Sequence, residues 1–530
     1  MTQAFGKLTA DVHDTMSRSP RLAPGVLAAA AVKLVLQLAA IRGYGPFRDE
    51  FYYIACSERL AFGYVDHPPL APLITAASRL VLGDSIVALR LVPALAGVVT
   101  VLLTGLIARE LGARRLGQTV AALCAALAPQ YFALHHFVSM NAYELVFWPL
   151  AALLVARIGR AAASGAVPLS AWVWLGVVTG LGLQNKLGML FFGAGIAAGF
   201  VLSGARRLLL TRGPWMAAAI AVAIFLPHVL WQVANGWPTV EFIENASRTK
   251  NIALPPAVFM REQVLAMNPV AAPIWIAGLV WLLASPAARP FRPLGIGYLA
   301  ILALFLFTAA KPYYLSPYYP VLLAAGGVVV DRALDAIRSR SAATAFRTAV
   351  VGLLILSGIA LVPLALPILP VETYIRYAAS LGVGPAQVER HQLGVLPQFY
   401  ADMFGWQELV DAVERAASAL APAEREKAVI FVGNYGEAGA INYLGRGRNL
   451  PRAISGHNNY WLWGPGDADG RVLLILGGTR EDHDECTTVE EVARVRCTYC
   501  MPFENDLPVF VCRDLKVPIP QIWQVVKHYD

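Results

Sequence analysis

Long apolar blocks limit what this chain of 530 residues can fold into. Most of them run for about 18–22 residues, and a helix of about 20 residues crosses the hydrocarbon core of a bilayer. Charged residues make up only 15% of the chain, whereas about 25% of a soluble globular protein is charged. The pattern predicts a polytopic α-helical membrane protein. We predict eleven spans, at about 24–41, 86–107, 117–134, 141–157, 168–184, 187–204, 214–232, 270–286, 294–310, 314–331 and 347–368.

Basic residues are concentrated in alternate loops between these spans. Short cytoplasmic loops of membrane proteins carry an excess of Lys and Arg, so the distribution predicts a cytoplasmic N-terminus. With an odd number of spans, the C-terminal segment 369–530 then lies on the extracytoplasmic side. The net charge of +8 follows from this topology. We therefore expect membrane lipids around the spans and no nucleic-acid partner.

The composition changes at residue 369, where charged residues become common and apolar runs shorten to strand length. We therefore divide the chain into a transmembrane domain, 1–368, and a soluble α/β domain, 369–530, which is large enough for its own core. The external loop 42–85 contains two amphipathic stretches, at about 50–62 and 69–82, that suit helices lying in the membrane interface. Inside the soluble domain we expect strands at Val429–Val432, Val472–Leu476 and Pro508–Val511, and helices at 402–419 and 487–495.

Four of the six cysteines fall in the soluble domain: Cys486, Cys497, Cys500 and Cys512. On an oxidising side of the membrane they favour disulfides, and four cysteines allow three pairings. Zinc binding through Cys497 and Cys500 is the alternative, although the chain has no matching second CxxC pair. The pairing therefore stays open.

Two adjacent acids open the first external loop, in the sequence Arg48-Asp49-Glu50-Phe51-Tyr52-Tyr53. One interpretation is a helix start, because Asp is a good N-cap and Glu in the first turn suits the helix dipole. The other is a general base that accepts a proton from an attacking hydroxyl or amine. Both can hold together, because a cap also fixes a carboxylate in place.

The same loop continues to Asp66-His67-Pro68-Pro69. Pro-Pro stiffens the entry to a helix, and a solvated acid before it requires no further role. The functional interpretation is a polar wall for a phosphate or sugar, in which His67 donates a hydrogen bond to a phosphate oxygen.

A third acid, Glu144, lies at the predicted outer end of a spanning helix. A carboxylate there is costly unless it faces a wet cavity, and Asn141 already suits the cap position. Glu144 is therefore a predicted site residue. His135 and His136 just precede this segment, and we interpret them as interfacial residues, with metal ligation as the alternative.

Several cations lie in the predicted external loops. Each one alone fits ordinary interfacial snorkelling. Together on one outer face beside acids they favour an anion site, because negative charge grows on a phosphate as its sugar bond breaks. These cations are Lys186, Arg248, Lys250, Arg261 and Lys311.

Three further features carry weaker signals. Gly433–Gly439 follows a predicted strand, lacks the GxGxxG spacing, and is interpreted as a tight strand-to-helix turn. The aromatic run His457–Trp463 suits either sugar stacking or a structural core. Lys33 lies inside the first predicted span and must face a cavity, a partner or the lipid headgroups.

In their order along the chain, these motifs resemble the glycosyltransferase C superfamily. Within it they are most similar to the protein O-mannosyltransferase and lipid A aminoarabinose transferase group, which uses polyprenyl-phosphate sugars. The likeness covers roughly residues 20–330. It rests on Asp49-Glu50 with Pro68-Pro69-Leu70, and on Asn141–Leu145, Leu183–Lys186 and Lys311–Leu315.

The resemblance implies roles for individual residues. Asp49 takes the position of the catalytic base, Asp66 and His67 that of the segment framing the donor phosphate, and Glu144 that of the later acid. Two positions depart from the pattern, because His67 stands where the aminoarabinose enzymes have Lys, and Glu144 stands where Asp is commoner. These departures put the identity of the sugar in doubt.

The expected function is inverting transfer of a sugar from a polyprenyl-phosphate carrier to a lipid, glycan or protein acceptor on the outer face of a bacterial inner membrane. No cofactor is assigned; the sequence permits a divalent metal without requiring one. A transporter or flippase of a lipid-linked or anionic substrate, marked by discontinuous helices and half-repeats, is the alternative, and a non-catalytic scaffold is a third. The predicted binding residues are Glu50, Tyr53, Asp66, His67, Glu144, Lys186, Lys311 and Tyr314.

Overall fold

A computed structural model describes residues 21–250, 252–308, 310–385 and 390–530. The chain forms two compact units, and each is built from separate stretches of sequence. The helical unit comprises the described part of Met1–Ile41, Val87–Leu230 and Ala253–Ile368. The sheet unit comprises Arg42–Ile86, Trp231–Ile252 and the described part of Leu369–Asp530. The sequence prediction divided the chain at residue 369 alone, whereas the structure groups two external loops with the C-terminal segment.

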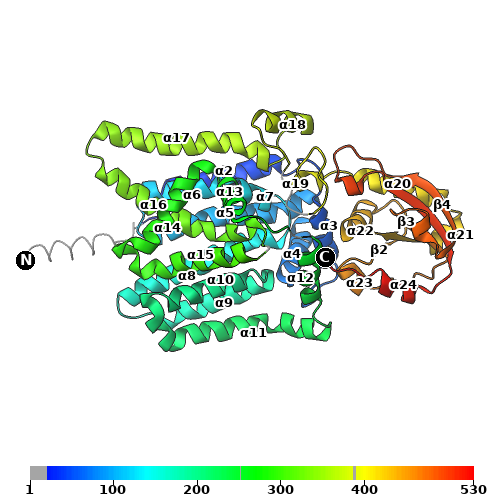
Figure 1. Cartoon of the computed structure of the whole chain (residues 1–530), viewed down its shortest axis with the longest axis horizontal. Coiled ribbons are helices and arrows are strands. Elements are labelled where there is room, and N and C mark those ends of the chain that lie inside the picture. The colour runs from blue at the N-terminus through cyan, green and yellow to red at the C-terminus, as the bar shows by residue number, and fades with distance from the viewer. Residues whose placement is uncertain (1–20, 251, 309, 386–389) are drawn as a thin grey trace, which may run out of the picture. The chain divides into compact units, whose positions relative to one another are not determined.

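Long apolar helices that run roughly parallel to one another make up the helical unit (Figure 1). Six helices in the described residues are long and apolar enough to cross a membrane, or eight if two bent pairs each count as one span. The predicted fold class is confirmed, but the predicted count of eleven is not. The six are Ile86–Glu110 (α5), Met140–Ala163 (α8), Arg212–Ala234 (α11), Pro286–Phe307 (η3 and α15), Pro312–Ala336 (η4 and α16) and Arg340–Ala365 (α17).

Several predicted spans form shorter or broken helices. The predicted span 117–134 divides at Pro129, which lacks a backbone N–H and begins a new helix. The bent pairs are α10 with η1, at 107°, and α13 with the helix that follows it, at 100°. The shorter helices are α2 (Pro24–Ala40), α6 (Arg115–Ala126), α7 (Pro129–Leu134), α9 (Leu169–Asn185), α10 (Met189–Val201), η1 (Gly204–Leu210), α13 (Pro256–Ala266), η2 (Pro269–Ala271) and α14 (Ala272–Ala284).

Glycines allow the backbones of the helical unit to approach closely. A Cβ on Gly327 of α16 would lie 2.3 Å from the carbonyl oxygen of Gly117 on α6. A Cβ on Gly278 of α14 would lie 2.1 Å from the carbonyl oxygen of Leu322 on α16. In a membrane the hydrophobic effect does not drive helices together, because lipid tails are as apolar as the side chains. Small residues therefore favour association by allowing close van der Waals contact between the helices.

The sheet unit is built on a five-stranded mixed sheet in the order β2-β1-β3-β5-β4. Strands β1, β2 and β3 are parallel, and β5 pairs antiparallel with β3 and β4. The three predicted strands are confirmed as β1, β3 and part of β5. The strands are β1 (Val429–Val432), β2 (Ala453–Ser455), β3 (Val472–Leu476), β4 (Cys486–Arg494) and β5 (Pro508–Leu515).

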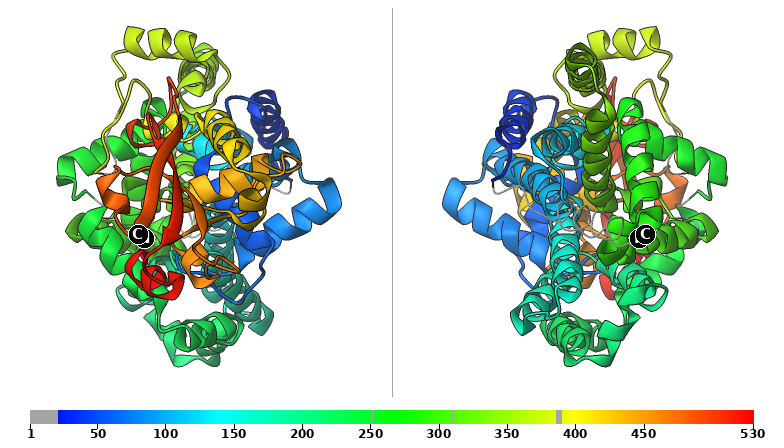
Figure 2. Two further views of the ribbon diagram at one scale, coloured as in Figure 1. Left: turned by 90° about the vertical axis from the view of Figure 1, so that its right-hand side faces the viewer. Right: turned by 90° about the vertical axis from the view of Figure 1, so that its left-hand side faces the viewer.

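The predicted helix at 487–495 is wrong, because this segment is strand β4. Its Glu-Glu-Val-Ala-Arg sequence favours helix, but β4 pairs with β5 along its length, from Cys486 opposite Leu515 to Arg494 opposite Pro508. The left view of Figure 2 shows these two strands side by side. Pairing with β5 therefore overrides the local propensity.

Helices and short turns surround the sheet. The predicted helix 402–419 is confirmed as α20, which begins after Gly405 at a φ of +91°. The helices of the sheet unit are α3 (Arg48–Ser57), α4 (Leu70–Leu82), α12 (Pro238–Thr249), α18 (Val371–Ser380), α19 (Gln398–Ala401), α20 (Trp406–Ala419), α21 (Pro422–Lys427), α22 (Tyr435–Leu444), α23 (Asn459–Leu462), η5 (Glu481–His483), η6 (Pro502–Glu504) and α24 (Ile519–Val525).

The two helices predicted to lie in the membrane interface differ in environment. Helix α4 exposes Leu80 and Val81, at 88% and 76%, as an interfacial helix requires. Helix α3 is instead largely buried in the sheet unit, because Phe51 packs against α22 at Gly439, where a Cβ would lie 2.7 Å from the Phe51 Cβ. Part of the first external loop thus belongs to the core of the sheet unit.

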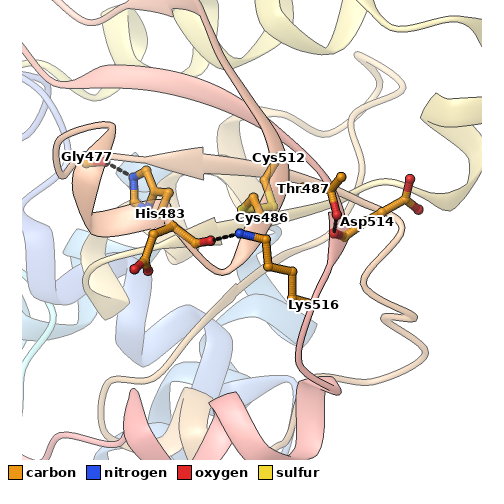
Figure 3. The surroundings of a disulfide bond; sticks show 8 residues. Gly477, His483, Cys486, Thr487, Cys512, Asp514 and Lys516 are labelled. Carbon is orange, nitrogen blue, oxygen red and sulfur yellow. Dashed lines mark hydrogen bonds between the residues drawn. A yellow bond between two sulfur atoms is a disulfide. The ribbon is translucent and has the colours of Figure 1, made fainter.

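One disulfide, Cys486–Cys512, joins β4 to β5 (Figure 3). Cys497 and Cys500 are thiols, and the Cys500 N–H donates to the Cys497 sulfur at 3.0 Å. Of the pairings that the sequence left open, the structure therefore contains the one that joins Cys486 to Cys512.

Replacing Cys486 and Cys512 with serine is expected to lower the thermal unfolding midpoint. The bridged residues are 26 positions apart, and closing such a loop stabilises a fold by about 3–4 kcal/mol in the chain-entropy treatment. Calorimetry of the purified chain without reductant measures the change, with Cys497→Ser as the matched control. Equal midpoints for the double variant and the wild type would contradict the prediction.

Candidate functional site

The two acids at the start of α3 have different roles. The Glu50 side chain is fully buried and accepts a hydrogen bond from the Phe47 backbone N–H at 2.8 Å, which caps the helix. Asp49 lies in the first turn, and its side chain is 32% exposed. The cap that the sequence offered as an interpretation of Asp49 is therefore made by Glu50, and the Asp49 carboxylate is available to solvent.

A tyrosine from a distant part of the sequence orients Asp49. The Tyr435 hydroxyl donates to Asp49 Oδ1 at 2.9 Å, and Arg48 Nε lies 3.8 Å from the same oxygen. Burial and the charge of Asp49 raise the pKa of Tyr435 well above its usual value. The hydroxyl therefore stays protonated and remains a donor to Asp49 at physiological pH.

Tyr435 lies on the turn after β1, where Asn434 caps α22. The Asn434 side chain accepts from the Gly436 and Glu437 N–H groups, at 2.8 and 3.0 Å. The predicted strand-to-helix turn at Gly433–Gly439 is confirmed. Sequence analysis missed Tyr435 as a site residue, because only the fold brings this turn to α3.

A second tyrosine holds Asp66 in the same way. The Tyr52 hydroxyl donates to Asp66 Oδ1 at 2.9 Å. The Tyr52 and Tyr435 rings stack with their centroids 4.5 Å apart. One stacked ring pair therefore positions both carboxylates, Asp49 and Asp66.

His67 lies next to Asp66 and is buried. Its ring is fully buried, stacks on Tyr53 at 4.9 Å, and has Nδ1 3.0 Å from the Pro68 carbonyl oxygen. Its Nε2 lies 3.9 Å from Asp66 Oδ1. The predicted binding residues His67 and Tyr53 thus form a buried aromatic layer, in which only the Asp66 side chain is partly exposed, at 16%.

A buried acid pair holds the turn that carries Tyr435. Glu437 accepts from the Gly433 N–H at 2.8 Å, and the Asn434 side chain donates to Glu504 at 3.0 Å. Burial and the neighbouring Glu504 raise the pKa of Glu437 well above its usual value, and burial raises the pKa of Glu504. Both carboxyl groups therefore favour their neutral forms more strongly than exposed carboxyl groups do.

The described residues contain one cluster of three potential metal ligands, formed by His457, His528 and Asp530. His457 lies behind the site, with its ring centroid 4.6 Å from that of Tyr435. Burial lowers the pKa of His457, and its hydrogen bond lowers the pKa of Asp530 to about 2. The His457–Trp463 run also supplies Asn459, which has a structural role because its side chain accepts from the Val65 N–H at 2.7 Å.

A separate polar cluster lies in the helical unit. Lys186 Nζ donates to Glu144 at 2.6 Å and to Asn141 at 2.9 Å. It also lies over the Tyr314 ring, 4.8 Å from the centroid. A Cβ on Gly188 would lie 2.0 Å from Glu144 Oε1, so glycine makes room for the carboxylate. Predicted residues Glu144, Lys186 and Tyr314 are thus neighbours.

The predicted cations are divided between the two units. Lys186, Arg261 and Lys311 belong to the helical unit, and Arg248 and Lys250 to the sheet unit. Arg261 pairs with Glu262 at 2.9 Å. Lys311 precedes the short helix η4, where Tyr314 lies.

Three predicted interfacial or unassigned residues are buried in the helical unit. His135 and His136 are at most 2% exposed, and the His135 ring contacts the Tyr131 carbonyl at 2.6 Å. Their interpretation as interfacial residues is therefore wrong, because neighbouring helices enclose them. Lys33 is also buried, with Nζ 3.7 Å from the Phe132 ring centroid.

Comparison with known proteins follows from this geometry. Residues 66–231 match the family described as dolichyl-phosphate-mannose-protein mannosyltransferase. ArnT from Cupriavidus metallidurans, in a crystal structure bound to undecaprenyl phosphate, matches with a TM-score of 0.57 and 16% identity, over 92% of this chain and 97% of its own. The Archaeoglobus fulgidus oligosaccharyltransferase, tethered to an acceptor peptide, matches with a TM-score of 0.50 and 14% identity, over 81% of this chain and 63% of its own. Comparison with curated protein sequences finds no match.

These findings show that the chain shares the fold of ArnT, in which a polytopic helical part accompanies a smaller sheet domain. More narrowly, the resemblance to the polyprenyl-phosphate-dependent group of the glycosyltransferase C superfamily is confirmed, through the mannosyltransferase family match and the fold shared with ArnT.

The sheet unit is expected to lose thermal stability as pH rises from about 4.3 into the neutral range, because the folded-state pKa values of Glu437 and Glu504 are raised. When folding raises the pKa of a carboxyl group, its contribution to the free energy of unfolding is fully present below the unfolded-state pKa, which is about 4.3 for Glu. This contribution is lost as pH rises through the folded-state pKa. Glu504→Gln removes one of the two titratable carboxyl groups of the Glu437 and Glu504 pair. It should therefore weaken the dependence of the unfolding midpoint on pH. Thermal unfolding of both proteins across this range is the measurement, and parallel curves would contradict it.

Gly188→Ala is expected to displace Glu144 from Lys186 and to lower the unfolding midpoint. Forcing a methyl group into a packed site costs about 1–3 kcal/mol. Gly193→Ala on α10 is the matched control, because no atom lies within 4 Å of its Cβ position. Differential scanning fluorimetry compares the two variants, and equal midpoints would show that the Glu144 site is not tightly packed.

Proposed function

We propose that this chain is an inverting glycosyltransferase that takes a sugar from a polyprenyl-phosphate carrier. The acceptor is a glycolipid, lipopolysaccharide, glycan or protein on the outer face of a bacterial inner membrane, with the N-terminus in the cytoplasm. The observation that carries the proposal is the state of Asp49, which the Glu50 cap leaves partly exposed and the Tyr435 hydroxyl orients. The family match over residues 66–231 supports the class of donor.

Asp49 acts as the general base in this proposal. Its carboxylate takes the proton from the acceptor hydroxyl or amine, and the acceptor atom attacks the anomeric carbon of the sugar. The bond between that carbon and the phosphate oxygen breaks, and polyprenyl phosphate leaves. A single displacement inverts the anomeric centre. Tyr435 is a positioning residue, because it acts through Asp49.

The leaving phosphate requires positive charge. We assign this role to Lys186 and Lys311 of the helical unit, beside Tyr314. Because Lys186 already pairs with Glu144 at 2.6 Å, phosphate binding has to share or replace that contact. Asp66, held by Tyr52, is assigned to hydroxyl groups of the sugar.

The sequence permits a divalent ion without requiring one, and the proposal assigns no role to such an ion. Glu50 is committed to the helix cap, and no third His, Cys or acidic group among the described residues clusters with Asp49 and Asp66. We therefore derive no step through a metal.

The transporter alternative gains one observation from the fold. Two helix pairs are bent by 107° and 100°, whereas the sequence analysis predicted no discontinuous helices. The fold nevertheless matches ArnT over 92% of the chain, and this overall likeness favours transfer over transport.

Asp49→Asn is expected to lower the turnover of the purified protein by at least about a hundredfold with an unchanged unfolding midpoint, because it removes the base and leaves the cap. Glu50→Gln is the matched control: it weakens the cap, lowers the midpoint and leaves residual turnover. Turnover is followed as release of polyprenyl phosphate from a lipid-linked sugar. Near-normal turnover in Asp49→Asn would contradict the proposal.

A further inference from the structure

A pocket of about 220 Å³ lies in the sheet unit on another face of α3 from Asp49. Phe51 and Ile54 of α3 and its C-cap residue Glu58 face it, whereas Asp49 and Tyr52 belong to the face that carries the acids. Sites for drug-sized ligands span roughly 300–1,000 Å³, so this pocket suits a single sugar ring. Its remaining wall comes from α22, α23 and the residues around them.

Three arginines line the pocket, namely Arg59, Arg446 and Arg452. They differ in how nearby acids balance their charges. Arg446 forms ion pairs with Glu58 and Asp84. Arg79 pairs with the same two acids. Two cations and two anions therefore neutralise one another in a closed network.

Arg59 and Arg452 lie outside this network. The described residues give neither guanidinium an ion pair, although acids line the cavity on the far side of Arg452. Arg59 is an exposed residue, but partial desolvation and the charge of Arg452 lower its pKa, and the charge of Glu58 opposes this shift. The two guanidinium groups are thus close enough to repel. Two like charges held together at a cavity favour a bound anion.

Aromatic residues orient these groups. The Arg59 guanidinium lies over the Trp463 ring, 4.8 Å from its centroid, and Tyr460 packs edge-on against Trp463 at 4.9 Å. A guanidinium stacked on a ring keeps its N–H donors in plane for a bidentate acceptor. The buried Tyr460 hydroxyl lies beside the Asn442 amide without a hydrogen bond of normal geometry among the described residues.

We propose that this pocket binds an anionic sugar, with its phosphate or carboxylate on Arg59 and Arg452 and its ring against Trp463 and Tyr460. The Tyr460 hydroxyl supplies a polar partner for the ring. The Asn442 amide is engaged by the Ala453 backbone, at 3.0 Å in both directions, and only positions this wall of the pocket. The site is separate from Asp49 and binds without transfer, so it does not depend on the proposed function.

Isothermal titration of the full chain in nanodiscs tests the proposal, with glucose 6-phosphate, glucuronate, glucose and inorganic phosphate as probes. The two anionic sugars are expected to bind, and Arg59→Gln or Arg452→Gln should weaken their affinity at least tenfold. Arg496→Gln, at a side chain that is 82% exposed, is the matched control and should bind as the wild type does.

Two outcomes would overturn the proposal. Equal affinity of all variants would show that the arginines do not form the site, and equal binding of inorganic phosphate and glucose 6-phosphate would show that the sugar ring is not recognised. Arg59→Lys keeps the charge but loses the planar fork. It should retain part of the affinity, and it provides a folded variant if the glutamine substitutions destabilise the chain.

Discussion

The stacked rings of Tyr52 and Tyr435 are the contact on which the external acids depend. Each ring presents a hydroxyl to one carboxylate, at 2.9 Å to Asp66 and at 2.9 Å to Asp49. A single hydrogen bond to a charged group contributes about 1.5–3 kcal/mol, so each contact is strong enough to select one orientation. Because the rings belong to α3 and to the first residue of α22, the carboxylates are positioned only when these helices pack together.

Protonation in the same region supports this arrangement. Tyr435 remains a neutral donor because burial and Asp49 both disfavour its anion. Two residues along α22, the pKa of Glu437 is raised by burial and by Glu504, and its carboxyl accepts backbone N–H groups of the preceding residues. The Glu437 carboxyl thus holds the start of α22, while the Asp49 side chain remains partly exposed. Glu50 is likewise buried and caps α3, which leaves the neighbouring Asp49 carboxylate partly exposed.

Sequence analysis predicted the parts of this molecule that periodicity and local chemistry determine. Apolar length identified the membrane helices, and β1, β3 and α20 follow from their residue patterns. It could not predict that β4 is a strand, because the pairing with β5 and the Cys486–Cys512 bridge decide that segment. It identified Asp49, Asp66 and Glu144 as acids worth explaining. It missed Tyr435, which lies 386 residues from its partner and reaches Asp49 only through the fold.

The central claim is that Asp49 removes a proton from the acceptor of a lipid-linked sugar. Mass spectrometry of membrane lipids and envelope glycans, from cells that make the wild type or Asp49→Asn, tests it most directly. The account predicts that the variant accumulates one polyprenyl-phosphate sugar and loses one glycan, which identifies donor and acceptor together. Identical lipid and glycan profiles in the two strains would contradict it.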